Sequence, residues 1–122
     1  MANAVAKIPF SASTQGQGIK VSATATAGTL IHTTGTSATL IDEVWLWAFN
    51  SDTADRTLTI EFGGATAPDQ NIVVTIPFKS GLVLVVPGLP LLGSGSVALT
   101  VKAFASAANV VTISGFVNRI TP

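Results

Sequence analysis

The sequence predicts an all-β fold: a single antiparallel two-sheet sandwich of about eight strands, jelly-roll-like, with an extended N-terminal arm. Three observations support this prediction. Apolar and polar residues alternate with a period of two, β-branched Thr and Val are abundant, and Gly, Pro, Asn and Asp interrupt the alternation at short intervals. Helical periodicity is almost absent, so parallel strands joined by helices are not expected. Another Greek-key arrangement is the second choice.

The 122 residues fit a single domain. We expect an N-terminal arm over residues 1–17 and a β-sandwich over residues 18–122. The arm is rich in Ala, Ser, Gln and Gly and contains one apolar cluster at residues 8–10. This composition is typical of an arm or of a loosely attached edge strand.

Residues 39–50 and 56–62 give the strongest strand patterns. In the second segment, Leu58, Ile60 and Phe62 would share one side while polar residues share the other, as in a strand with one solvated face. The expected strands, in chain order, cover residues 19–27, 29–34, 39–50, 56–62, 71–76, 82–86, 97–104 and 110–120. We expect turns between them, and a longer Gly/Pro/Ser loop at residues 87–96.

Two of these strands are apolar on both faces. In residues 44–49, aliphatic residues alternate with Trp45, Trp47 and Phe49, and residues 82–86 are apolar throughout. A sandwich strand buries only one face in its own core. Loop 87–96, the arm or a neighbouring subunit must cover the other face, and aromatic side chains are favoured in subunit interfaces. The interface candidates are Ile8, Phe10, Trp45, Trp47, Phe49, Leu89, Leu91 and Leu92.

Charge and composition argue against several classes of partner. Lys and Arg balance Asp and Glu, so the net charge is zero, whereas a nucleic-acid-binding protein needs a basic face. The longest apolar stretch, residues 82–92, contains two prolines and a glycine and cannot form a membrane-spanning helix. Residues 1–10 lack the apolar run of a secretory signal. We therefore expect neither nucleic acid nor membrane as a partner, and no export through a signal peptide.

The residue types that enzymes need are scarce. The chain has no Cys and one histidine, His32, which lies in a strand-like stretch without a nucleophile elbow nearby. A zinc site needs about four ligands, so it is not expected here. Asp42 and Glu43 are adjacent, so they would point to opposite faces of a strand and could not act as a carboxylate pair. We expect a structural or surface role for His32, and no enzyme activity.

Two further groups of residues read as turns. Asn50, Asp52 and Asp55 could offer oxygen atoms to Ca²⁺, but their spacing differs from that of an EF-hand, and such residues are common in hairpin turns. The glycines at 63–64 and 93–95 lack the Lys and the following helix of a phosphate-binding loop. No cofactor and no metal ion are therefore expected.

Four segments resemble parts of a known class of protein: residues 40–50, 58–64, 81–88 and 113–120. Together they resemble head decoration, or cement, proteins of tailed bacteriophages with a β-sandwich fold. The similarity covers roughly residues 28–120 and rests on strand patterns and turn residues. It implies a protein made in the host cytoplasm that binds the outer capsid surface of the virion, usually as a homotrimer. Such a protein bridges neighbouring major capsid protein subunits.

Other functions remain open. A carbohydrate-binding or receptor-binding sandwich of a virion fibre would stack Trp45, Trp47 and Phe49 on sugar rings, which requires polar groups beside them; along the chain their neighbours are aliphatic. A head–tail or tail-tube component would form rings. An enzyme is the least favoured class.

Overall fold

The computed structural model describes residues 4–122 and shows nine strands and no helix within them. The all-β prediction is confirmed, with nine strands where about eight are predicted. The strands are β1 (Ala4–Pro9), β2 (Ile19–Lys20), β3 (Thr29–Thr33), β4 (Ile41–Asn50), β5 (Arg56–Phe62), β6 (Asn71–Ile76), β7 (Val83–Leu91), β8 (Thr100–Ala105) and β9 (Val111–Thr121).

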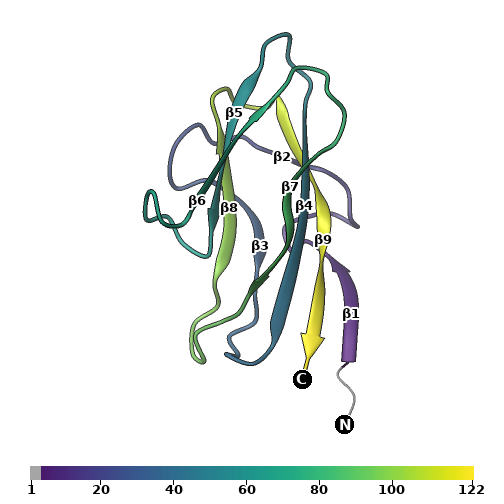
Figure 1. Cartoon of the computed structure of the whole chain (residues 1–122), viewed down its shortest axis with the longest axis vertical. Helices are drawn as coiled ribbons and strands as arrows, with labels where there is room; N and C mark the ends of the chain where they lie inside the picture. Colours follow the sequence, from purple (N-terminus) through teal and green to yellow (C-terminus); the bar gives the residue numbers. More distant parts are fainter. Residues whose placement is uncertain (1–3) are drawn as a thin grey trace.

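The strands form two antiparallel sheets, which appear as two layers in Figure 1. The first sheet has the order β1-β9-β4-β7, and β2 also pairs with β9. The second has the order β3-β8-β5-β6. The pairs are nested along the chain: β1 and β2 pair with β9, β3 with β8, β4 with β7, and β5 with β6. The predicted two-sheet architecture is therefore confirmed.

The core lies between the two sheets and consists of the inward-facing residues of each strand. Alternate residues of β4, from Asp42 to Asn50, are buried, while those between them are half-buried on the outer face. This alternation follows from the pleat, which points successive side chains to opposite faces. The fully buried aliphatic residues include Ile31, Val44, Leu46, Leu58, Ile60, Ile76, Val86, Val101, Val111, Ile113 and Val117.

The N-terminal segment is attached to the sandwich over residues 4–12. Residues 4–9 form edge strand β1, which pairs with β9 from Ala4–Thr121 to Pro9–Phe116. Phe10 follows and is only 2% exposed, because its side chain enters the core. The composition of residues 1–17 allowed either an arm or an edge strand, and residues 4–9 form an edge strand. Residues 1–3 lie outside the described residues.

Two segments differ most from the predicted strand boundaries, while the others shift by at most three residues at either end. β7 continues through Pro87 and Pro90 to Leu91, where the sequence predicts a loop. Proline is tolerated there because β7 is an edge strand, and the β4–β7 register shifts at two places along it. In the predicted strand 19–27, only Ile19–Lys20 is strand. The amides of Ser22 and Ala23 instead donate to the hydroxyl of Thr29, so they do not continue the ladder.

Candidate functional site

The outer face of the first sheet carries a cluster of aromatic side chains. Trp45 lies opposite Phe116 in the β4–β9 pairing, and Trp47 follows two residues later on the same face. The rings of Trp45 and Trp47 are stacked, with centroids 6.3 Å apart, and the rings of Trp47 and Phe116 are 6.0 Å apart. All three side chains are half-buried. We call these residues, together with the half-buried Phe49, the aromatic face.

Polar groups border one side of the aromatic face. The Glu43 carboxylate accepts a hydrogen bond from Trp45 Nε1 at 2.7 Å and another from Asn118 Nδ2 at 3.1 Å. The hydrogen bond from Trp45, followed by that from Asn118, holds the pKa of the Glu43 carboxyl below its usual value. Lys7 Nζ lies 4.5 Å from the centre of the Phe116 ring, in cation–π geometry. The face therefore combines flat apolar rings with an anionic, an amide and a cationic group.

Strand β7 borders the other side with aliphatic residues. Leu84 lies opposite Trp47 and is 46% exposed, and the exposed Pro87 lies opposite Trp45. Leu89 is 39% exposed, but it pairs with the inward-facing Val44. Gly88 lies beneath Trp45, because a Cβ at this position would lie 2.7 Å from the indole ring. The apolar surface therefore continues from the tryptophans to the edge of the sheet.

The eight interface candidates lie in different parts of the fold. Phe10 and Leu91 belong to the chain's own core, so they are not available to a partner in this structure; the sequence places both in segments read as arm and loop. Ile8 and Leu92 are half-buried, and Ile8 packs against the core. Trp45, Trp47 and Phe49 lie half-buried on the outer face of the first sheet, and Leu89 is exposed on its edge strand β7.

Several members of this surface are not among the sequence candidates. Phe116, Lys7, Glu43 and Asn118 come from β9, β1 and β4, and only strand pairing brings them together. Alternation in the expected strand 110–120 places Phe116 on the outer side, and alternation in 39–50 places Glu43 on the same side as Trp45. The sequence gives no signal for the β4–β9 register, which places Asn118 opposite Glu43.

A buried charged cluster occupies the opposite side of β4. His32 Nε2 lies 2.7 Å from Asp42 Oδ2, and Arg119 makes two hydrogen bonds to the Asp42 carboxylate, both of 2.8 Å. Burial raises the pKa of Asp42, but the hydrogen bonds from Arg119 and His32, together with the charge of Arg119, outweigh it, so this pKa lies below its usual value. The hydrogen bond with Asp42 in turn raises the pKa of Arg119.

This cluster does not have the geometry of a catalytic site. His32 is 1% exposed, and its second ring nitrogen, Nδ1, accepts a hydrogen bond from the Ser11 amide at 3.1 Å. Both ring nitrogens are thus occupied, and no free nitrogen faces a substrate. The Ser11 hydroxyl accepts a hydrogen bond from the Thr33 amide rather than contacting the ring.

The acidic residues that could be considered for Ca²⁺ stabilise a turn. Asp52 accepts hydrogen bonds from the Thr53 amide and from Arg56, and Asp55 accepts one from the Phe78 amide. Asn50 is buried and donates to two backbone carbonyls. Within residues 4–122, no group of three or more His, Asp or Glu side chains could hold a metal ion.

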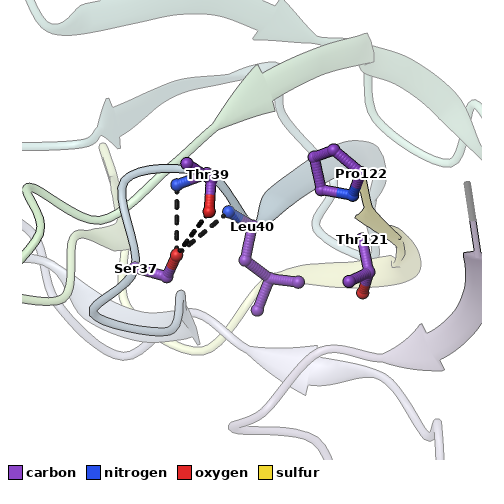
Figure 2. A pocket seen from close by; sticks show the side chains of 5 residues that line it. All are labelled: Ser37, Thr39, Leu40, Thr121 and Pro122. Atoms are coloured by element: carbon purple, nitrogen blue, oxygen red, sulfur yellow. Dashed lines mark hydrogen bonds between the residues drawn. The ribbon is translucent and has the colours of Figure 1, made fainter.

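An open pocket of about 470 Å³ lies where β9 ends (Figure 2). Ser37, Thr39, Leu40, Thr121 and Pro122 line it. The Ser37 hydroxyl accepts hydrogen bonds from the amides of Thr39 and Leu40, which uses it within the local turn. No Asp, Glu, Lys, Arg or His side chain lines the pocket, so the aromatic face is the stronger candidate site.

Comparisons with family models, with curated proteins and with solved structures gave no match for this chain. The part of the chain that the structure describes contains no helix with the length and apolar character of a membrane span.

Proposed function

We propose that this chain is a non-enzymatic structural protein of a tailed-phage virion that decorates the outside of the capsid and cements it by bridging major capsid protein subunits. The aromatic face is the observation that carries the proposal. It presents two tryptophans and two phenylalanines on one sheet surface, and none of them is fully buried by the chain itself. The resemblance of four segments to phage decoration proteins also supports it.

We further propose that the fold is a jelly roll. If β1 and β2 are counted as one strand interrupted at residues 10–18, eight strands remain. This combined first strand pairs with β9, β3 pairs with β8, β4 with β7, and β5 with β6. This nested order is the one expected when a long antiparallel hairpin is rolled into two sheets.

The energetics of the aromatic face suit a lattice-bound protein. If a partner covers about 100 Å² of the remaining apolar surface, the gain is about 2.5 kcal/mol per subunit before entropic costs. That gain is small for a single site, but simultaneous attachment at several points raises the overall affinity strongly. We propose a homo-oligomer, with a trimer favoured, which would contact several capsid subunits at once.

The proposal is tested by measuring solution mass and capsid binding together. We expect the purified chain to be a homotrimer that co-sediments with capsids of its virion. Trp47→Ala removes part of the aromatic face and should weaken oligomerisation or capsid binding at least about tenfold, because buried aromatic residues dominate interface energies.

A matched control is Val73→Ala, which truncates a 63% exposed apolar residue on the second sheet. This variant should assemble and bind as the native chain does. A monomer that ignores capsids would contradict the proposal, as would equal effects of the two substitutions.

One observation favours a second candidate, carbohydrate binding by a virion fibre or receptor-binding domain. Stacked tryptophans lie beside Glu43, Asn118 and Lys7, whereas their neighbours along the chain are aliphatic. Flat rings bordered by hydrogen-bonding groups are suited to sugars. Binding to a glycan array that is abolished by both Trp47→Ala and Asn118→Ala would support this candidate; a chain that binds capsids but no glycan would exclude it.

A further inference from the structure

The N-terminal segment crosses from the first sheet to the second. After β1 pairs with β9, Phe10 enters the core and Ser11–Ala12 run along β3. We call residues 4–12 the N-terminal strap. The strap covers an edge of each sheet, so whatever holds it in place determines whether these edges are accessible.

Three hydrogen bonds attach the far end of the strap to β3. The Ser11 amide donates to His32 Nδ1 at 3.1 Å, and the Ala12 amide donates to the Ile31 carbonyl at 3.2 Å. In the reverse direction, the Thr33 amide donates to the Ser11 hydroxyl at 2.8 Å. Only the first of these bonds depends on an acceptor that can take up a proton.

The hydrogen bonds of His32 define its state. Nδ1 accepts from an amide, so it carries no proton, and Nε2 carries the proton that is donated to Asp42. The charged groups that face the ring are Asp42 from β4 and Arg119 from β9. On β8 the residue paired with His32 is the uncharged Val101. The other charged residues on these elements point away from the ring. Glu43 of β4 and Lys7 of the strap lie on the outer face of the first sheet, and Lys102 alternates with the buried Val101 and Ala103.

We propose that His32 is a pH-sensitive latch, and that its protonation releases the strap from β3. Protonation places a hydrogen on Nδ1, which then faces the Ser11 amide hydrogen, so the bond is lost and two donors oppose each other. It also adds a positive charge to a buried cluster in which Arg119 and Asp42 already balance. Residues 10–12 would leave β3, withdrawing Phe10 from the core and exposing the β3 edge.

The chain makes this mechanism easy to isolate. It contains one histidine, and histidine is the side chain that ordinarily changes charge between about pH 8 and about pH 5. The proposal concerns the fold alone and does not depend on capsid or glycan binding, so it can fail while the proposed function holds.

The test is NMR of the ¹⁵N-labelled full chain between about pH 7 and about pH 5. Long-range ¹H–¹⁵N spectra show which ring nitrogen carries the proton, and amide-exchange protection factors report strap attachment. We expect the Nε2–H form at the upper end. On acidification, protection of the strap amides should fall about tenfold, in step with ring protonation, while amides of the β4–β9 pair keep theirs.

Two variants sharpen the result. His32→Asn supplies a side-chain oxygen near the position of Nδ1 that cannot be protonated in this range, so strap protection should become independent of pH. Ser11→Ala removes the acceptor for Thr33 but keeps the Ser11 amide, so protection should fall at every pH while the acid-dependent drop remains.

If a variant does not fold, measurements on the native chain alone can still contradict the proposal. A ring that stays neutral until the whole protein unfolds would contradict it. So would a ring that titrates while strap protection remains constant, or an Nδ1–H form at the upper end of the range.

Discussion

At the scale of single residues, Asp42 shows what the sequence reveals and what it hides. Alternation correctly separates Asp42 from Glu43: the first is fully buried and the second lies on the outer face. The sequence does not indicate how a buried carboxylate is tolerated, because Arg119 lies 77 residues away along the chain. A buried charge is stable only when it is paired and hydrogen-bonded, and here Arg119 and His32 provide both.

We expect Arg119→Met to lower the free energy of unfolding by about 1–3 kcal/mol at neutral pH, because it leaves a buried carboxylate with one partner fewer. The depressed pKa of Asp42 means that its charged form stabilises the fold above the pKa of the unfolded chain, and that this contribution is lost as pH falls through the folded-state pKa. The difference between native chain and variant should therefore shrink in acid. Urea unfolding over this pH range measures it.

The control for this prediction is Arg56→Met. Arg56 is about as exposed as Arg119, but its partner Asp52 is 22% exposed instead of 1%. A solvent-exposed ion pair contributes little to stability because water screens it, so this variant should lose much less than Arg119→Met. Equal losses in both variants would show that burial of the carboxylate is unimportant.

At the scale of elements, the strongly alternating strands were predictable and the irregular edge was not. β5 covers the predicted residues 56–62, because alternation and turn signals agree there. The expected solvated face was wrong, because Thr59 and Glu61 are buried and Glu61 accepts hydrogen bonds from the segment before β3. β7 runs five residues past its predicted end at Val86, through two prolines that normally indicate a loop. On the open side of an edge strand there is no partner strand, so proline's missing N–H costs no hydrogen bond there. The sequence does not show which strands are edge strands, because that depends on strand order. Three of the four residues of the aromatic face could be found from the sequence, because Trp45, Trp47 and Phe49 all lie on β4. Phe116 joins them only through the pairing of β4 with β9.

Gly88 and Gly81 allow a test of how β7 supports the aromatic face. Both glycines have φ of +76°, so alanine at either position introduces similar backbone strain of about 1 kcal/mol. A Cβ at Gly88 would also collide with Trp45, whereas a Cβ at Gly81 would meet no atom within 4 Å. We expect Gly88→Ala to destabilise the fold by a further 1–3 kcal/mol, roughly the cost of overpacking, and to shift tryptophan fluorescence. If the two variants behaved alike, Trp45 would not be packed on Gly88.

At the scale of the whole molecule, a sandwich follows from composition, but the order of its strands does not. Short alternating segments without helices lead to two packed sheets. Which strand pairs with which is set by contacts between distant segments, such as β1 with β9, and no local pattern encodes them. The N-terminal strap was partly hidden for the same reason, since a polar, Gly-rich segment is typical of an arm unless its partners are known.

The pairing of Ala4 with Thr121 places the two ends of the described chain on adjacent strands (Figure 1). We therefore expect a circular permutant to fold, with Pro122 joined to Met1 by a short linker and new ends between Ser80 and Gly81, both of which are exposed. Circular dichroism and the urea midpoint would check this. An unfolded permutant would indicate that the turn at residues 77–82, rather than β1–β9 pairing, organises the fold.

The antiparallel contact of β1 with β9 also determines how the molecule responds to mechanical tension. Pulling the two ends apart loads the hydrogen bonds of this pair one after another, from Ala4–Thr121 inward, so the strands unzip at low force. Traction spread across the broad outer surface of the first sheet would instead be shared by many bonds at once. The molecule should therefore resist a force that acts across the outer face of the first sheet, and unfold readily under a force that acts on its two termini.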